Sequence, residues 1–240
     1  MSSWNTFCDS DAARKSFARM AAMRLRRRLL NPVLRRVDPR RFRDERWMPA
    51  QGTATPEPAV SRPPSALWLE ATDSQGQLAS WWSGDWWGRC LASWGRAAVT
   101  VVLLPTPGAI LMPAVLEQLG RVCVAARKWR LIAQTRGDEL ASTAAVDRLL
   151  RTPYHEVEFL AGDDVLPGRG RGYVAWRAQR ILAVMKQVVE LRGARGLTRP
   201  LVAWRWDAGR APAAPPSIAE AQALARQLQV DRFVVPGRAE

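Results

Sequence analysis

ALWLEAT (66–72) and AAVTVVLLP (97–105) begin a series of six short apolar runs that decides the fold of this chain. The other four are WRLIAQT (129–135), YHEVEFLA (154–161), PLVAWRW (200–206) and RFVVP (232–236). A loop and a stretch with helical spacing separate each run from the next. Runs that alternate with helices indicate a parallel sheet with right-handed crossovers. Because a closed barrel of this type needs eight strands, we predict an α/β fold: a six-unit (βα) partial TIM-type barrel over residues 66–240.

The helices between the runs are expected at 85–95, 112–127, 138–150, 173–192 and 217–228. The stretch at 173–192 is the clearest, since its apolar residues recur at i, i+3 and i+4. At the last helix, Ser217 is the predicted N-cap and Glu220 stands three residues later, which is the pattern of a capping box. Each helix would cover the sheet between two successive strands.

Residues 1–48 form a basic amphipathic helical extension in our interpretation, with a helix over 11–36 and a proline-rich linker at 49–65. Residues 1–64 hold 14 Lys and Arg against 6 Asp and Glu, a net charge of +8. One interpretation is that this helix docks to an acidic membrane surface or to nucleic acid. The alternative is a solvated extension. The arginines that would make the contact are Arg24, Arg26, Arg27, Arg28, Arg35 and Arg36.

The whole chain carries a formal net charge of +14 over 240 residues. Such a balance favours an anionic partner. The alternative is that the positive charge reflects composition alone, since bacterial-type proteins rich in Ala, Arg, Gly and Pro commonly have arginine-rich surfaces. The chain has three cysteines far apart in sequence and one histidine, so we do not expect a structural zinc site. With so few cysteines we expect a cytoplasmic protein. We expect no transmembrane segment, because Pro105 and Pro107 interrupt the region of the longest apolar stretch.

The loop after the first run, DSQGQLASWWSGDWW (73–87), contains neither cysteine nor histidine and is rich in tryptophan. Such a cluster could form an aromatic platform for a ligand. The alternative is that the rings fill the core, which is the commoner role of tryptophan. The candidates are Trp81, Trp82, Trp86 and Trp87.

Carboxylates in the loops after the strands are candidates for acid–base chemistry, since barrel enzymes place their active sites there. The three residues considered are Asp73, Glu139 and Asp163. Capping and loop solvation are the alternative roles. His155 is expected to be structural, and GRGRG (168–172) is expected to be a flexible basic loop because it lacks the Lys-Ser/Thr ending of a phosphate loop.

Several loop sequences match a known pattern in register. LEAT (69–72) stands where that pattern has an E-V-T run, PTPGA (105–109) where it has GGEP, and TRGDEL (135–140) where it has TNG-x-x-L. LAGDD (160–164) follows the fourth run in place of an S-[IL]-D-G turn. In these features residues 66–236 resemble the core of the radical SAM superfamily, which has a six-unit partial barrel.

The resemblance implies a [4Fe–4S] cluster on a CxxxCxxC motif and S-adenosylmethionine as cofactors, but the matching positions do not hold the ligands. The cluster ligands fall at Gly76, Ser80 and Ser83, none of which can replace a thiolate. The acid that grips the amino group of S-adenosylmethionine falls at Gly108. We therefore predict no cofactor and expect a ligand on the post-strand face, near the four tryptophans and Thr106, Thr135, Arg136 and Gly137.

The leading hypothesis is an atypical radical SAM-like protein without the cluster, a pseudoenzyme that acts as a binding or partner protein. Its partner would be an intact radical SAM enzyme or another protein. A second hypothesis is an enzyme of another class that uses rim carboxylates on a small polar or phosphorylated substrate. A third is a basic module that binds nucleic acid or an acidic membrane through its N-terminal helix.

Overall fold

The computed structural model describes residues 45–48, 63–72, 76–82, 84–166, 169, 172–207 and 215–235. The predicted helix over 11–36, its six arginines and almost all of the linker lie outside these residues, so those predictions stay predictions.

One parallel sheet with its strands in chain order forms the centre of the fold. Its strands are β1 (Glu45–Met48), β2 (Ala66–Leu69), β3 (Thr100–Leu103), β4 (Arg130–Thr135), β5 (Glu156–Ala161), β6 (Leu201–Trp206) and β7 (Arg232–Val234). The six predicted runs form β2 to β7. The α/β class and the all-parallel sheet are therefore confirmed, and the sequential order is that of a partial barrel.

The seventh strand, β1, was not predicted. Residues 45–48 were assigned to the helical extension, but they pair in parallel with β2, from Glu45 beside Ala66 to Met48 beside Leu69. The prediction was wrong here because ERWM mixes charged and apolar residues and offers no apolar run. Main-chain pairing at the edge of β2, which depends little on side chains, places this strand.

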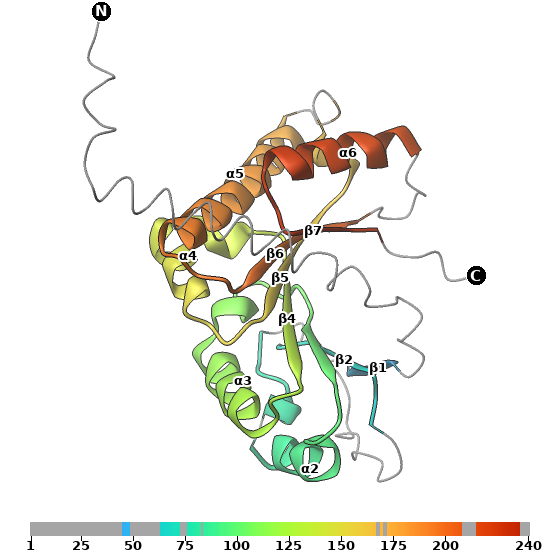
Figure 1. The fold of residues 1–240 in the computed structure, drawn as a ribbon, viewed down its shortest axis with the longest axis vertical. Helices are drawn as coiled ribbons and strands as arrows, with labels where there is room; N and C mark the ends of the chain where they lie inside the picture. The colour runs from blue at the N-terminus through green and yellow to red at the C-terminus, as the bar shows by residue number, and fades with distance from the viewer. Residues whose placement is uncertain are drawn as a thin grey trace, which may run out of the picture.

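Five described α-helices lie along the convex side of the curved sheet (Figure 1). They are α2 (Gly84–Trp94), α3 (Pro113–Ala125), α4 (Thr143–Leu150), α5 (Tyr173–Ala194) and α6 (Pro215–Gln227). Short 3-10 turns follow the strands: η2 (Ser80–Trp82), η3 (Ala109–Leu111), η4 (Asp138–Leu140) and η5 (Asp163–Val165). The helix predicted at 138–150 is thus η4 followed by α4, whose N-cap is Ser142: its Oγ accepts the N–H of Ala145 at 3.1 Å.

The predicted capping box at Ser217 is wrong, because α6 begins two residues earlier at Pro215. Proline suits the first turn of a helix, since its fixed φ is helical and its missing N–H would have no partner there. Ser217 is instead buried, and its Oγ accepts from Arg169 Nη1 at 2.6 Å. The other nitrogen of this guanidinium lies 3.2 Å from Glu220 Oε2. Both residues thus hold the loop after β5 against α6.

The two faces of the sheet differ in character. Alternate residues of each strand, such as Val157 and Phe159 of β5, pack with the helices in one hydrophobic core. The opposite face, here called the inner face, carries charged and polar side chains among apolar ones such as Val102 and Ile132. On it Glu156 is paired with Arg130 and Arg232, and Glu158 Oε2 accepts from Gln134 at 2.9 Å.

Candidate functional site

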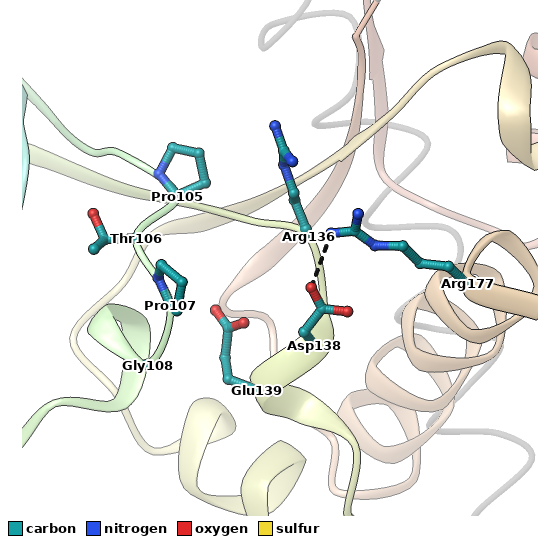
Figure 2. Close-up of a pocket in the computed structure, with 8 residues that line it drawn as sticks. All are labelled: Pro105, Thr106, Pro107, Gly108, Arg136, Asp138, Glu139 and Arg177. Carbon is teal, nitrogen blue, oxygen red and sulfur yellow. Dashed lines mark hydrogen bonds and ion pairs between the residues drawn. The ribbon is translucent and has the colours of Figure 1, made fainter. Parts of the chain in front are cut away.

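A pocket of about 500 Å³ lies at the carboxyl ends of β3 and β4 (Figure 2). Parallel sheets place their ligands at this end, and the volume suits a small molecule. The residues around it come from the loop after β3, the turn after β4 and the first turns of α5. They are Pro105, Thr106, Pro107, Gly108, Arg136, Asp138, Glu139 and Arg177.

The turn after β4 is held by the last residue of the strand. Thr135 Oγ1 accepts the N–H of Gly137 at 2.8 Å and donates to Glu139 Oε1 at 2.8 Å. Gly137 has φ of 82°, a conformation that favours glycine because it carries no Cβ. These contacts fix the Glu139 carboxylate in the pocket. Thr135 and Gly137 are themselves buried, so these two predicted ligand residues support the site from behind.

The pocket carries two guanidinium groups and two carboxylates. Arg177 Nη2 lies 3.0 Å from Asp138 Oδ2, and this ion pair closes one side (Figure 2). Arg136 is exposed and has no carboxylate partner among the described residues. Glu139 is half-buried, and its one hydrogen-bond partner in the part of the chain that the structure describes is the neutral hydroxyl of Thr135. The lining is therefore neutral in sum but presents one cation and one anion that are not paired with each other.

The wall from β3 is apolar apart from Thr106, and Tyr154 ties it to the sheet. The hydroxyl of Tyr154 donates to the carbonyl oxygen of Ile110 in η3 at 3.2 Å. Burial, and after it the negative charge of Glu139, raises the pKa of Tyr154 far above its usual value. Tyr154 therefore stays protonated and serves as a fixed donor rather than as a base.

Three of the four tryptophans considered as an aromatic platform or as core filling lie away from the pocket. Trp82, Trp86 and Trp87 are buried in the core, with the Trp86 and Trp87 ring centroids 4.9 Å apart. Trp82 Nε1 donates to the carbonyl of Glu70 at 3.2 Å. None of these three lines the pocket, so their placement favours the packing interpretation over the ligand platform. The side chain of Trp81 lies outside the described residues.

The positions that match the cluster ligands offer no suitable donors. Gly76 is exposed with φ of 77° and has no side chain, and Ser80 is an exposed hydroxyl at the start of η2. Ser83 lies outside the described residues. Iron–sulfur clusters are held by thiolates, so the chemistry of these donors does not fit the group. Within the described residues, no three His, Cys, Asp or Glu side chains are grouped to hold a metal ion.

Of the three carboxylates predicted for acid–base work, the structure brings only Glu139 to the pocket. Asp163 Oδ1 lies 3.5 Å from Arg169 Nη1 in an ion pair of the η5 region. Asp73 lies outside the described residues. His155 is structural, as expected: its Nδ1 accepts the N–H of Leu131 at 3.2 Å.

Two pocket residues were missed. Asp138 was considered only for the helix dipole, and Arg177 was not considered because it lies in a helix 40 residues beyond Gly137 along the chain. Its helical spacing from Tyr173 places it one turn inside α5, on the side of the η4 turn. Thr106, Gly108 and Arg136 from the predicted post-strand loops line this pocket together, and the binding of a ligand there stays a prediction.

Comparisons with protein-family models, curated proteins and solved structures found no match to this chain. In the part of the chain that the structure describes, no helix is long and apolar enough to cross a membrane.

Proposed function

We propose that this chain is an atypical radical SAM-like protein that binds a small zwitterionic ligand in the rim pocket and performs no radical reaction. The pocket at the carboxyl ends of β3 and β4 carries this proposal, because it combines a fixed carboxylate with a guanidinium that has no carboxylate partner among the described residues. The sequential parallel sheet and the TRGDEL turn support the relation to that fold. The loop after β2 has no thiolate, which speaks against a cluster.

The charges of the pocket match an amino-acid group. The Glu139 carboxylate, held by Thr135, would accept an ammonium, and the Arg136 guanidinium would bind a carboxylate in a two-point contact. The acid expected at Gly108 is missing, but Glu139 lines the same pocket and would supply the negative charge from the neighbouring loop. A singly charged anion would leave Glu139 uncompensated, so a zwitterion fits best.

We also propose that the chain binds a partner protein. The first candidate for this partner is an intact radical SAM enzyme. An enzyme of another class that uses two rim carboxylates has less support. Asp138 is bound to Arg177 and Asp163 to Arg169, so the described pocket lining offers Glu139 no second carboxylate that is free of an ion pair.

Calorimetric titration of the full chain with methionine and with S-adenosylmethionine tests the ligand class. We expect binding of at least one of the two, and Glu139→Gln or Arg136→Ala should weaken it by roughly 10- to 100-fold, the value of one charge-assisted hydrogen bond. Glu117→Gln and Arg121→Ala are matched controls, since these residues form an exposed pair on α3 away from the pocket, and they should leave affinity unchanged. No binding of either probe would overturn the zwitterion assignment.

Anaerobic iron–sulfur reconstitution tests the other half of the proposal. We expect no stable charge-transfer absorbance in the visible range and no stoichiometric iron or sulfide after desalting. A stable [4Fe–4S] signal at one cluster per chain would show that the chain is a radical SAM-type cluster protein after all.

A further inference from the structure

The first two turns of α5 expose an aromatic column that neither the core nor the pocket uses. Tyr173 is 72% exposed and Trp176 is 51% exposed, although both side chains are large and aromatic. Their ring centroids lie 5.6 Å apart at an interplanar angle of 29°, so the two rings are stacked. Val174 beside them is 46% exposed. An exposed cluster of this kind marks an interaction surface more often than a packing accident.

A guanidinium extends the column on its other side. The Cζ atom of Arg180 lies 5.2 Å from the centroid of the Trp176 ring, which is cation–π distance. The two rings and the guanidinium therefore lie along one face of the helix, and Tyr173, 72% exposed among the described residues, offers ring surface to a further planar group.

The column adjoins the cationic edge of the rim pocket. Arg180 Nη2 donates to the carbonyl oxygen of Asp138 at 3.4 Å, and the side chain of Asp138 is paired with Arg177. Neither Arg180 nor Arg136 has a carboxylate partner among the described residues. Arg180 thus adds a cation to the exposed rings, and Arg136 adds a second in the pocket that Asp138 joins to this column, in a chain with a formal net charge of +14.

We propose that the Tyr173–Trp176–Arg180 column is a stacking platform for single-stranded nucleic acid. Unpaired bases stack on the rings, and Arg180 and Arg136 contact the adjacent phosphates. This is the combination of aromatic faces and cations by which proteins bind single strands with little sequence preference. A duplex hides its bases, so the platform selects single strands.

The size and charge of the surface favour this ligand over a partner protein. A stable protein interface buries about 800 Å² on each side and needs an apolar centre of many residues. The column offers three exposed apolar side chains, which suffice for one or two bases. A partner protein that bound this surface through electrostatic attraction alone would not require the stacked rings.

The test measures fluorescence anisotropy of labelled 12-nucleotide oligouridylate and oligothymidylate with the full chain at low salt. We expect Trp176→Ala to weaken binding by roughly 5- to 100-fold, the value of stacking one base, and Trp176→Phe to restore most of the loss. Arg180→Ala and Arg136→Ala should lower both the affinity and its dependence on salt. Because Trp176 is exposed, its replacement should leave the circular dichroism spectrum unchanged.

Two matched controls separate the column from general charge. Arg121→Ala changes the net charge by the same amount as Arg180→Ala, but Arg121 lies on α3. Val124→Ala truncates an apolar residue of α3 that is 81% exposed. Both should bind like the parent. Cations elsewhere in the chain contribute equally to the affinity of every variant. The difference in affinity between column variants and control variants therefore measures the contribution of the column.

Three outcomes would overturn the proposal: equal binding by Trp176→Ala and the parent, failure of Trp176→Phe to restore affinity, or an equal loss with poly-L-glutamate, which carries charge but no bases. The last result would assign the surface to an acidic protein. Since methionine titration reports on the rim pocket alone, failure here and failure of the proposed ligand can be told apart.

Discussion

Arg232 on β7 reaches across β6 to bind Glu156 on β5, with its Nη1 2.9 Å and 2.8 Å from the two carboxylate oxygens. Ala203 of β6 is the register partner of Arg232 and lies between the two strands on the inner face. Its small side chain leaves room for the arginine to cross. Glu156 is fully buried, and its second partner is Arg130 of β4, so one carboxylate ties together β4, β5 and β7.

Removal of the guanidinium of Arg232 should therefore destabilise the sheet. In Arg232→Met, Glu156 keeps only Arg130, and burial, which already raises the pKa of Glu156, acts with less compensation. We expect the free energy of unfolding in urea to fall by about 2–3 kcal/mol, somewhat less than for a buried charge left with no partner.

Arg121→Met is the control for this prediction. It breaks an exposed pair four residues apart on α3, and such pairs contribute about 0–1 kcal/mol. Adding Glu156→Gln to Arg232→Met should recover part of the stability, because a neutral amide costs less to bury than a carboxylate that has lost one of its two guanidinium partners. Equal stability of Arg232→Met and Arg121→Met would show that the inner-face cluster does not hold the sheet.

Two buried tryptophans offer a comparison of a bonded and an unbonded indole. Trp87 Nε1 is buried without an acceptor among the described residues, whereas Trp129 Nε1 donates to the carbonyl oxygen of Trp94 at 3.3 Å. Phenylalanine removes the N–H from either position and a similar part of the ring. Because an unsatisfied donor costs free energy and a bonded one does not, Trp129→Phe should destabilise by about 1 kcal/mol more than Trp87→Phe. Equilibrium unfolding of both variants measures the difference, and an equal or reversed order would contradict the prediction.

The strands β2 to β7 were predictable, and the edge strand β1 was not, for one physical reason. β2 to β7 bury one face against helices, so their sequences carry apolar side chains such as Val101, Leu103, Val157 and Val202. That requirement leaves a visible pattern. β1 joins the sheet by main-chain pairing with β2, and such pairing requires no particular pattern of side chains in the sequence.

The pocket was predictable in its location and only partly in its residues. Thr106, Arg136 and Glu139 stand in the segments that follow β3 and β4, and the ends of parallel strands meet at one edge. Arg177 reaches the same place only through the packing of α5 on η4, which no local pattern encodes. The alternation in EVEF (156–159) did hold a signal for the inner face, since two glutamates on one face of a buried strand require partners.

Glycines at two positions should respond to alanine in opposite directions. A Cβ on Gly162, after β5, would lie 2.1 Å from the carbonyl oxygen of Asp207, and neither main-chain segment can move freely. Gly88 lies within α2, and a Cβ there would meet nothing within 4 Å. We expect Gly162→Ala to destabilise by about 1–3 kcal/mol and Gly88→Ala to stabilise by about 0.5–1 kcal/mol. Thermal unfolding of the two variants decides it, and a tolerated Gly162→Ala would contradict the close approach of these loops.

The single histidine of the chain allows a pH prediction that can be read directly. Burial, followed by the charges of Arg199 and Arg130, lowers the pKa of His155 below its usual value of about 6.5. Its Nδ1 must also stay unprotonated to accept the N–H of Leu131. Below pH 6.5 the unfolded chain therefore binds a proton that the folded chain does not, so this residue makes stability fall as the pH drops towards the folded pKa.

Proton NMR can follow this residue alone, because the sequence has one histidine. We expect its ring signal to titrate with a midpoint below 6.5 in the folded protein. His155→Asn, which keeps an acceptor near Leu131 without a titrating group, should lose less stability than the parent between pH 7.5 and pH 5.5. A midpoint above 6.5, or the same pH dependence in both proteins, would mean that His155 is not held neutral by its surroundings.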